Sequence, residues 1–193
     1  MARLGLFAYG SLVSPESASE TLGRPVEASA VARLGGWRRR WSTLRDNREC
    51  EKTFARRDNG GLPGYVLGLN LEPSGDEAEA PNGVILELTE AELERLDVRE
   101  LRYARFEVTR HLGQACQLEA VFAYRAKPAH FAARPPHDAI VIASYAAFVE
   151  SAFQALGPGQ GELYLETTGP PPVEVVEAVL VEDRIPAGNP RRW

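Results

Sequence analysis

The sequence predicts a single α+β domain in which most strands precede the longest helix. Three observations lead to this prediction. Short apolar and β-branched segments fill much of the first half, a capped helix follows them, and the apolar residues of 140–156 recur at helical spacing. A chain of 193 residues is long enough to bury one sizeable core. We expect the domain to span residues 1–185, and residues 186–193, rich in Pro and Arg, to form a tail.

Composition excludes several classes of protein. A formal net charge of −5 argues against a protein whose main task is to bind nucleic acid. Cys50 and Cys116 lack the spacing of a disulfide framework or a zinc site, and the three histidines lack partners at metal-ligand spacing. No segment approaches the roughly 20 apolar residues that a bilayer span requires, and the N-terminus lacks a secretory apolar core. We therefore expect a cytoplasmic protein with reduced cysteines, no metal, no nucleic-acid partner and no membrane association.

The N-terminal segment predicts a strand, a turn and a short helix. Residues 4–9 form an apolar run that ends at Gly10 and reads as a buried strand entering a turn. Ser14 is suited to cap a helix with Pro15 in its first position, and Gly23 is suited to end it. This helix would hold the turn in place.

Further elements follow along the chain. The apolar and β-branched content predicts strands at 26–34, 37–43, 65–71, 84–88, 103–110, 118–124 and 173–181. The polar stretches 45–64 and 72–82 are expected to be long loops. The periodicity of 140–156 predicts the longest helix, and the glycine-rich residues 157–161 predict a loop after it.

A capping box predicts a helix in the middle of the chain. The Thr89 hydroxyl can accept from the backbone N–H of Glu92, whose carboxylate can reach back to residue 89. The helix is expected to run from Glu90 to about Leu96. Glu100 then lies just beyond the helix end and just before the next strand, so that rigid elements flank it on both sides.

Two segments combine residues suited to chemistry. Gly10, within Phe7-Ala8-Tyr9-Gly10-Ser11-Leu12, permits backbone angles closed to other residues, so that N–H groups can surround a small anion or carbonyl. Taken alone, this string equally describes an ordinary turn between a strand and a helix. Glu100 is one of several acidic residues in its region, and spacing alone does not single it out.

The two segments together carry a family resemblance. Leu96-Asp97-Val98-Arg99-Glu100, followed by Tyr103 and Arg105, and the Phe7–Leu12 segment resemble the signature of the γ-glutamylcyclotransferase-like family. This family includes γ-glutamylcyclotransferase itself, the ChaC-type enzymes and the γ-glutamylamine cyclotransferases. Pro15 and the segments 36–41, 63–66 and 82–85 resemble family positions in the same order. The resemblance spans about residues 4 to 125.

The resemblance implies a fold and a reaction. It implies a small, mostly antiparallel β-barrel with flanking helices, and it implies the cyclisation of a γ-glutamyl group to 5-oxoproline with release of an amine. Glu100 would be the general acid/base, because one carboxyl group can serve both proton transfers. The backbone of Gly10, Ser11 and Leu12 would bind the substrate, with Tyr9 and Tyr103 as further substrate contacts. No cofactor is implied. The partner is expected to be a small γ-glutamyl compound, whose identity stays open, as does the oligomeric state.

Two other hypotheses about function remain open. The same fold can serve as a non-catalytic module that binds a small ligand or a partner protein. Alternatively, the many basic and aromatic residues of 33–57 are suited to single-stranded nucleic acid. Acidic residues lie in the same stretch, and alternation along a strand would divide its arginines between two faces. This second reading is therefore the weaker one.

Overall fold

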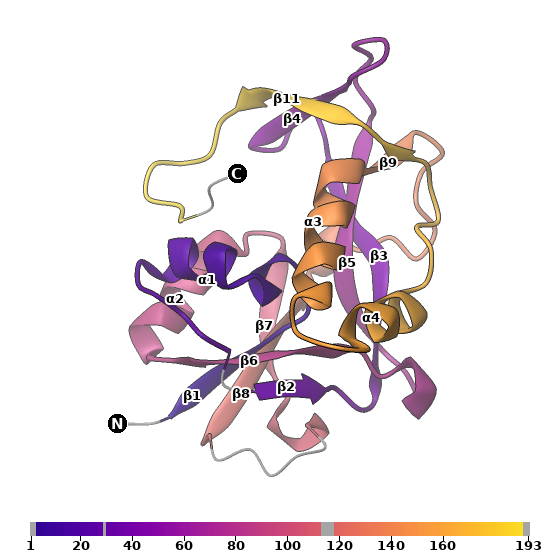
Figure 1. Cartoon of the computed structure of the whole chain (residues 1–193). Helices are drawn as coiled ribbons and strands as arrows, with labels where there is room; N and C mark the ends of the chain where they lie inside the picture. The colour runs from indigo at the N-terminus through magenta and orange to yellow at the C-terminus, as the bar shows by residue number, and fades with distance from the viewer. Residues whose placement is uncertain (1–2, 29, 113–117, 191–193) are drawn as a thin grey trace.

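The structure, a computed structural model, describes residues 3–28, 30–112 and 118–190. Two β-sheets and a two-stranded ribbon form its framework (Figure 1). The five-stranded sheet has the order β2 (Ala30–Arg33), β6 (Asn82–Leu88), β1 (Leu4–Ala8), β8 (Ala120–Ala126) and β7 (Tyr103–Glu107). The four-stranded sheet has the order β10 (Val175–Val176), β9 (Ala139–Ile142), β5 (Tyr65–Pro73) and β3 (Trp37–Asp46). The ribbon pairs β4 (Lys52–Arg56) with β11 (Ala178–Asp183).

Four α-helices within the described residues pack around these strands. They are α1 (Pro15–Leu22), α2 (Glu90–Arg99), α3 (Ala143–Gln154) and α4 (Gln160–Thr168). In Figure 1, α1 and α2 lie beside each other next to the five-stranded sheet, and α3 lies in front of β5 in this view. The β4–β11 ribbon lies at the opposite end of the molecule from β1 and β2. The α+β class predicted from the sequence is confirmed.

The expected closed barrel is not present among the described strands. They form separate sheets, and both larger sheets are mixed, because β1 runs parallel to β8 and β9 runs parallel to both β5 and β10. Beyond the edge strands β2 and β7, a single bridge joins Leu34 to Leu112. One bridge is not a hydrogen-bonded ladder, so the five-stranded sheet stays open within the part of the chain that the structure describes.

The first predicted unit is confirmed. β1 leads through Gly10 into a 3-10 helix over Ser11–Val13. The Ser14 hydroxyl then caps α1 by accepting from the backbone N–H of Ser17, and Gly23 ends the helix at a φ of 73°, where a side chain would be strained. The residues of β1 from Gly5 to Ala8 are buried, so the turn is anchored to the core.

The capping box is also confirmed, with both of its reciprocal bonds present between Thr89 and Glu92. The helix runs to Arg99, three residues further than expected, and Glu100 is its C-cap. Leu93 and Leu96 are buried on the inner face of α2. Glu100 therefore leaves the helix at a point that core packing has fixed.

Three elements differ from the prediction. β4 lies inside the expected loop 45–64, β9 occupies the first residues of the expected helix 140–156, and α4 begins within the expected loop 157–161. All four residues of β9 are buried between two neighbouring strands. Their apolar run shows no alternation, so in the sequence it looks like the start of the helix that follows. In α4, a Cβ on Gly161 would lie 2.7 Å from Cγ of Gln154, so this glycine permits close packing of α4 against α3.

Other boundaries shift by a few residues. The strand expected at 26–34 begins at Ala30, and the one expected at 103–110 ends at Glu107. The valine-rich segment 173–181 divides into β10 and β11. In the expected tail, the Asn189 side chain donates to the carbonyl of Val98 at 2.8 Å. Residues 191–193 of that tail and Cys116 lie outside the described residues. None of the described helices combines the length and apolar character needed to cross a bilayer.

Candidate active site

The six residues singled out in the sequence line one cavity. Tyr9, Gly10, Ser11, Leu12, Glu100 and Tyr103 surround a hollow of about 60 Å³, together with residues of β1, Leu69, Tyr124 and Tyr145. We call this hollow the turn chamber. The segments that contribute Ser11 and Glu100 are almost ninety positions apart in the sequence. The fold brings the carboxyl group and the turn to the same space.

Gly10 contributes space to the chamber. Its φ of −138° lies outside the left-handed region. A Cβ built on Gly10 would lie 3.6 Å from the Tyr145 hydroxyl and 3.8 Å from Cδ1 of Leu69. Both residues line the chamber, so a larger side chain at position 10 would occupy it.

Glu100 is largely enclosed, with 12% of its side chain exposed. Its backbone N–H donates to Leu96, which ties the residue to the last turn of α2. One carboxylate oxygen lies 3.1 Å from Nε of Arg99. The same guanidinium donates to the hydroxyl of Ser11 at 3.2 Å and to the hydroxyl of Thr21 in α1. Arg99 therefore connects the carboxyl group to the turn and to the helix behind it.

The two tyrosines predicted to contact substrate are held by backbone carbonyls. The Tyr9 hydroxyl donates to the carbonyl of Tyr124 at 2.7 Å, and the Tyr103 hydroxyl donates to that of Leu69 at 2.9 Å. Burial, and then the neighbouring Tyr103 and Glu100, raise the pKa of Tyr9 well above its ordinary value of 10.0. Tyr9 thus stays protonated at neutral pH. Since its proton is given to the backbone, its oxygen would act toward a ligand as an acceptor.

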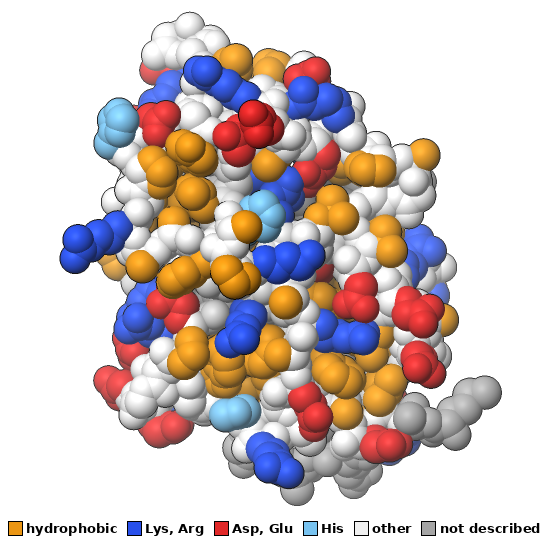
Figure 2. Space-filling model, turned by 180° about the vertical axis from the view of Figure 1, so that it is seen from behind, with side chains coloured by type: hydrophobic (Ala, Val, Ile, Leu, Met, Phe, Trp, Pro, Cys, Tyr) orange, Lys and Arg blue, Asp and Glu red, His pale blue; other side chains and the backbone are white. Residues whose placement is uncertain are grey.

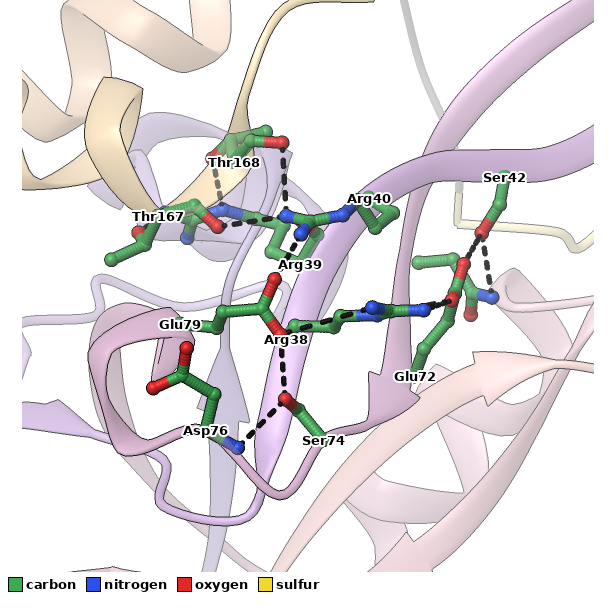
Figure 3. Close-up of polar contacts among 11 residues, drawn as sticks. Arg38, Arg39, Arg40, Ser42, Glu72, Ser74, Asp76, Glu79, Thr167 and Thr168 are labelled. Carbon is green, nitrogen blue, oxygen red and sulfur yellow. Dashed lines mark hydrogen bonds and ion pairs between the residues drawn. The ribbon is translucent and has the colours of Figure 1, made fainter. Parts of the chain in front are cut away.

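Arg39 supports the turn from inside the protein. Its exposed fraction is 0%, and its guanidinium donates to the carbonyls of Tyr9 and Asn82 at 3.2 and 2.8 Å. It also donates to the Thr168 hydroxyl at 2.7 Å (Figure 3). Its Cζ lies 4.5 Å from the ring centroid of Tyr164, a cation–π contact. Burial lowers the pKa of Arg39 to about 9, so the group is still cationic at neutral pH.

The arginines beside Arg39 face the other way, as alternation along a strand predicts. Arg38 pairs with Glu72 at 3.0 Å, and Arg40 pairs with Glu79 (Figure 3). On the face shown in Figure 2, basic and acidic side chains are interspersed with hydrophobic ones. Arg38, Arg39 and Arg40 are thus divided between the core and ion pairs, and they do not form a continuous basic strip.

A second cavity adjoins the turn chamber. It measures about 150 Å³ and shares Ser11, Glu100, Tyr103 and Tyr145 with the first. We call it the basic chamber, because Arg45, Lys52, Arg99 and Arg102 also line it. Glu100 lies where the two chambers meet.

Sequence reasoning missed several of these residues. Tyr145 was part of an expected helix whose first residues are in fact β9, and Lys52 was in an expected loop that is in fact β4. The junction of a strand and a helix often presents residues to a site, which would have drawn attention to Tyr145. The junction can be found only once β9 is recognised as a strand. Arg39 belongs to the basic segment 33–57, whose arginines were expected on two faces, and its complete burial comes from the packing of α3 and α4 over β3.

Within the described residues, no three His, Cys, Asp or Glu side chains gather as they would around a metal ion. Burial raises the pKa of Cys50, which is typical of a structural thiol and not of a nucleophile.

Comparison with known proteins identifies the fold. No protein-family model matches the sequence, and no curated protein does. Among solved structures, the chain is similar to one described as a gamma-glutamyl cyclotransferase, with 16% identity, a TM-score of 0.59, and coverage of 88% of this chain and 89% of that one. An uncharacterized protein from Homo sapiens aligns with 16% identity and a TM-score of 0.58, over 89% and 90% of the two chains.

A yeast gamma-glutamyl cyclotransferase described as specific to glutathione gives 14% identity and a TM-score of 0.54, over 86% and 95% of the two chains. The structural neighbours thus include gamma-glutamyl cyclotransferases, in agreement with the resemblance seen in the sequence. At these identities the likeness establishes a shared fold, which does not by itself define an activity.

Proposed function

We propose that this protein cyclises the γ-glutamyl group of a small peptide or amine to 5-oxoproline and releases the amine, with Glu100 as general acid/base. The observation that carries the proposal is the cavity in which the Glu100 carboxylate and the Tyr9–Leu12 turn lie together. The shared fold of a solved gamma-glutamyl cyclotransferase supports it.

The reaction is an intramolecular aminolysis. The α-amino nitrogen of the γ-glutamyl group attacks the side-chain amide carbonyl, and the bond from that carbonyl to the leaving nitrogen breaks. Glu100 accepts a proton from the attacking nitrogen and delivers it to the leaving nitrogen, so that no other reactant is consumed. A carboxyl group located where two chambers meet is suited to serve both nitrogens.

The turn would bind the glutamyl half of the substrate. The first N–H groups of a 3-10 helix have no partner within the helix, so those of Ser11 and Leu12 are suited to a carboxylate or a developing oxyanion. The N–H of Val13 donates to the carbonyl of Gly10 at 3.0 Å. The cation of Arg39 behind the turn favours negative charge there, because charges interact strongly in a buried environment. Holding the substrate in a bent pose would supply acceleration through proximity.

The test is a panel of γ-glutamyl dipeptides and γ-glutamylamines assayed for 5-oxoproline. At least one member should turn over, and Glu100→Gln should lower kcat/KM by roughly 100- to 10,000-fold while the circular dichroism spectrum stays unchanged. Glu94→Gln, an exposed acid on the same helix, is the matched control and should retain activity. Ligand binding without turnover across the panel would reject catalysis in favour of the binding module.

A further inference from the structure

The basic chamber has a strongly asymmetric charge. Four cationic side chains line it, from Arg45, Lys52, Arg99 and Arg102, together with the carboxylate of Glu100. Three of these cations come from elements that flank the site directly: Arg99 ends α2, Arg102 precedes β7, and Lys52 begins β4. The lining therefore carries a surplus of positive charge beside the proposed general acid.

These cations are withdrawn from water. Lys52 is 2% exposed, and Arg102 is 8% exposed. Phe54 and Ile142 contribute apolar surface to the same walls, and the Arg45 guanidinium lies over the Phe54 ring at 5.0 Å from its centroid. Charges in such surroundings act on a ligand more strongly than charges in water do. An anion that enters the chamber is favoured, and a cation is repelled.

Carboxylates lie near three of these cations. Glu51 binds Arg102 with both oxygens, and Glu100 pairs with Arg99. The Lys52 ammonium lies 3.7 Å from Asp183, whose side chain is 46% exposed and lies on β11. This distance exceeds that of a hydrogen bond, so the contact is a loose ion pair at the edge of the protein.

The position of the chamber indicates which part of a substrate it would receive. The turn chamber and the basic chamber share Ser11, Glu100, Tyr103 and Tyr145. A substrate whose glutamyl half binds the turn must pass Glu100 to extend into the basic chamber. The group that follows the scissile amide nitrogen is the leaving amine.

We propose that Lys52 and Arg45 are specificity-determining residues that select a leaving amine with an anionic side chain, so that the preferred substrate is a γ-glutamyl derivative of an acidic amino acid. This inference rests on the proposed function, since it assigns the leaving half of the same substrate. An acidic leaving group offers two carboxylates to the basic chamber, whereas a neutral amino acid offers one. A polyamine or a lysine side chain would add positive charge and is selected against.

A pair of near-isosteric ligands tests the inference on binding alone. γ-Glutamyl-glutamate and γ-glutamyl-glutamine differ by one charge and can be titrated calorimetrically into the Glu100→Gln protein, in which turnover does not interfere. We expect the acidic dipeptide to bind about tenfold tighter or more, which is the effect of one good charge-assisted hydrogen bond. Its advantage should shrink as salt concentration rises.

Variants of the two lysines locate the effect. Lys52→Met in the Glu100→Gln background should remove most of the difference between the dipeptides, and Lys52→Arg should restore part of it. Lys127→Met is the matched control, because Lys127 is the other lysine of the chain and is exposed. It should leave the difference intact. Because each comparison uses two ligands on one protein, a general loss of stability would affect both ligands alike.

The outcomes separate this inference from the proposed function. Equal affinities, no binding of either dipeptide, or an equal loss for both ligands in Lys52→Met would overturn the inference. If the wild-type protein converts both dipeptides with the same kcat/KM, the proposed function stands and the inference fails. If the acidic dipeptide binds selectively but the wild-type protein releases no 5-oxoproline, the charge selection stands and the catalytic proposal fails.

Discussion

Arg99 Nε lies 3.1 Å from the carboxylate of Glu100, its neighbour in the sequence. Consecutive residues of a helix point in different directions, so this contact depends on the helix ending at Glu100. The other end of the Arg99 guanidinium donates to Ser11 and Thr21. One buried side chain thus sets the distance between the proposed acid and the turn.

The first prediction concerns this contact. Arg99→Met should lower kcat roughly 10- to 100-fold with a smaller change in KM, because a misplaced acid impairs the chemical step more than binding. Arg99→Lys keeps the charge but not the fork geometry and should recover part of the loss. Steady-state kinetics on the best substrate of the panel provide the measurement.

Arg95→Met is the control for Arg99. Arg95 lies one turn earlier on α2 and donates to the carbonyl of Thr21, so it also joins α2 to α1. Arg99 lines the basic chamber, whereas Arg95 lines neither chamber. A loss of kcat in Arg95→Met as large as that in Arg99→Met would assign the Arg99 effect to helix packing.

The second prediction concerns Arg39. Arg39→Met should lower the free energy of unfolding by about 2–4 kcal/mol, because the carbonyls and hydroxyls that it now satisfies would be left buried without a donor. Arg38→Met is the matched control from the outward face of β3 and should cost less than about 1 kcal/mol. Urea unfolding of both variants gives the comparison, and similar costs would contradict the prediction.

The third prediction separates space from backbone strain at Gly10. Gly10→Ala should fold with nearly unchanged stability, since its Cβ would meet Tyr145 and Leu69 at ordinary contact distances. Gly10→Val should also fold, but it would fill part of the turn chamber and lower kcat/KM about tenfold or more. Thermal unfolding and the 5-oxoproline assay report the two effects separately.

Gly83→Ala provides the contrast to Gly10→Ala. A Cβ on Gly83 would lie 2.4 Å from the carbonyl oxygen of Ala8, which belongs to the paired strand β1. We expect a cost of roughly 1–3 kcal/mol from this overpacking. A larger loss of stability at position 10 than at position 83 would mean that Gly10 is needed for its backbone conformation.

The fourth prediction concerns the pH dependence of the capping box. Arg24, and then Thr89, hold the pKa of Glu92 below its ordinary value of 4.5. A carboxyl group whose pKa is lowered by folding stabilises the protein above the unfolded-state pKa, and this stability is lost as the pH falls through the folded-state pKa. Glu92→Gln should therefore be less stable than the wild type at pH 7, by about 1 kcal/mol.

Below the pKa of Glu92 in the folded protein, the wild-type carboxyl is also neutral, so the difference should vanish in acid. Guanidinium unfolding between neutral pH and about pH 3 measures it. Glu94→Gln, exposed on the same helix, should give a small difference throughout. A Glu92→Gln difference that does not change with pH would show that the charge of Glu92 has no part in its effect.

Local signals in the sequence predicted the local structure well. Ser14 with Pro15, and Thr89 with Glu92, describe complete helix starts, because a cap depends on residues within one turn of each other. The end of α2 was predicted less well, since the helix runs to Arg99 and not to about Leu96. The family resemblance brought the turn into relation with this residue, which short-range patterns alone could not do.

The errors concern residues whose structure depends on distant partners. β4 is a polar strand that pairs with β11, more than a hundred residues later, and its Lys52 is buried in the wall of the basic chamber. β9 is fixed by parallel pairing on both sides, which leaves no alternation to read. The burial of Arg39 also depends on distant residues, since the hydrogen-bond acceptors of its guanidinium come from α4 and β6.

The ribbon of β4 and β11 carries one wall of the basic chamber, and β11 comes from the last part of the described chain. Lys52 and Asp183 face each other across this pairing. If the two proposals hold, sequence changes in β11 would alter which amine is released without disturbing Glu100, the proposed acid. The proposed selection of the amine and the proposed proton transfer would then depend on separate parts of the protein, so that each could diverge independently.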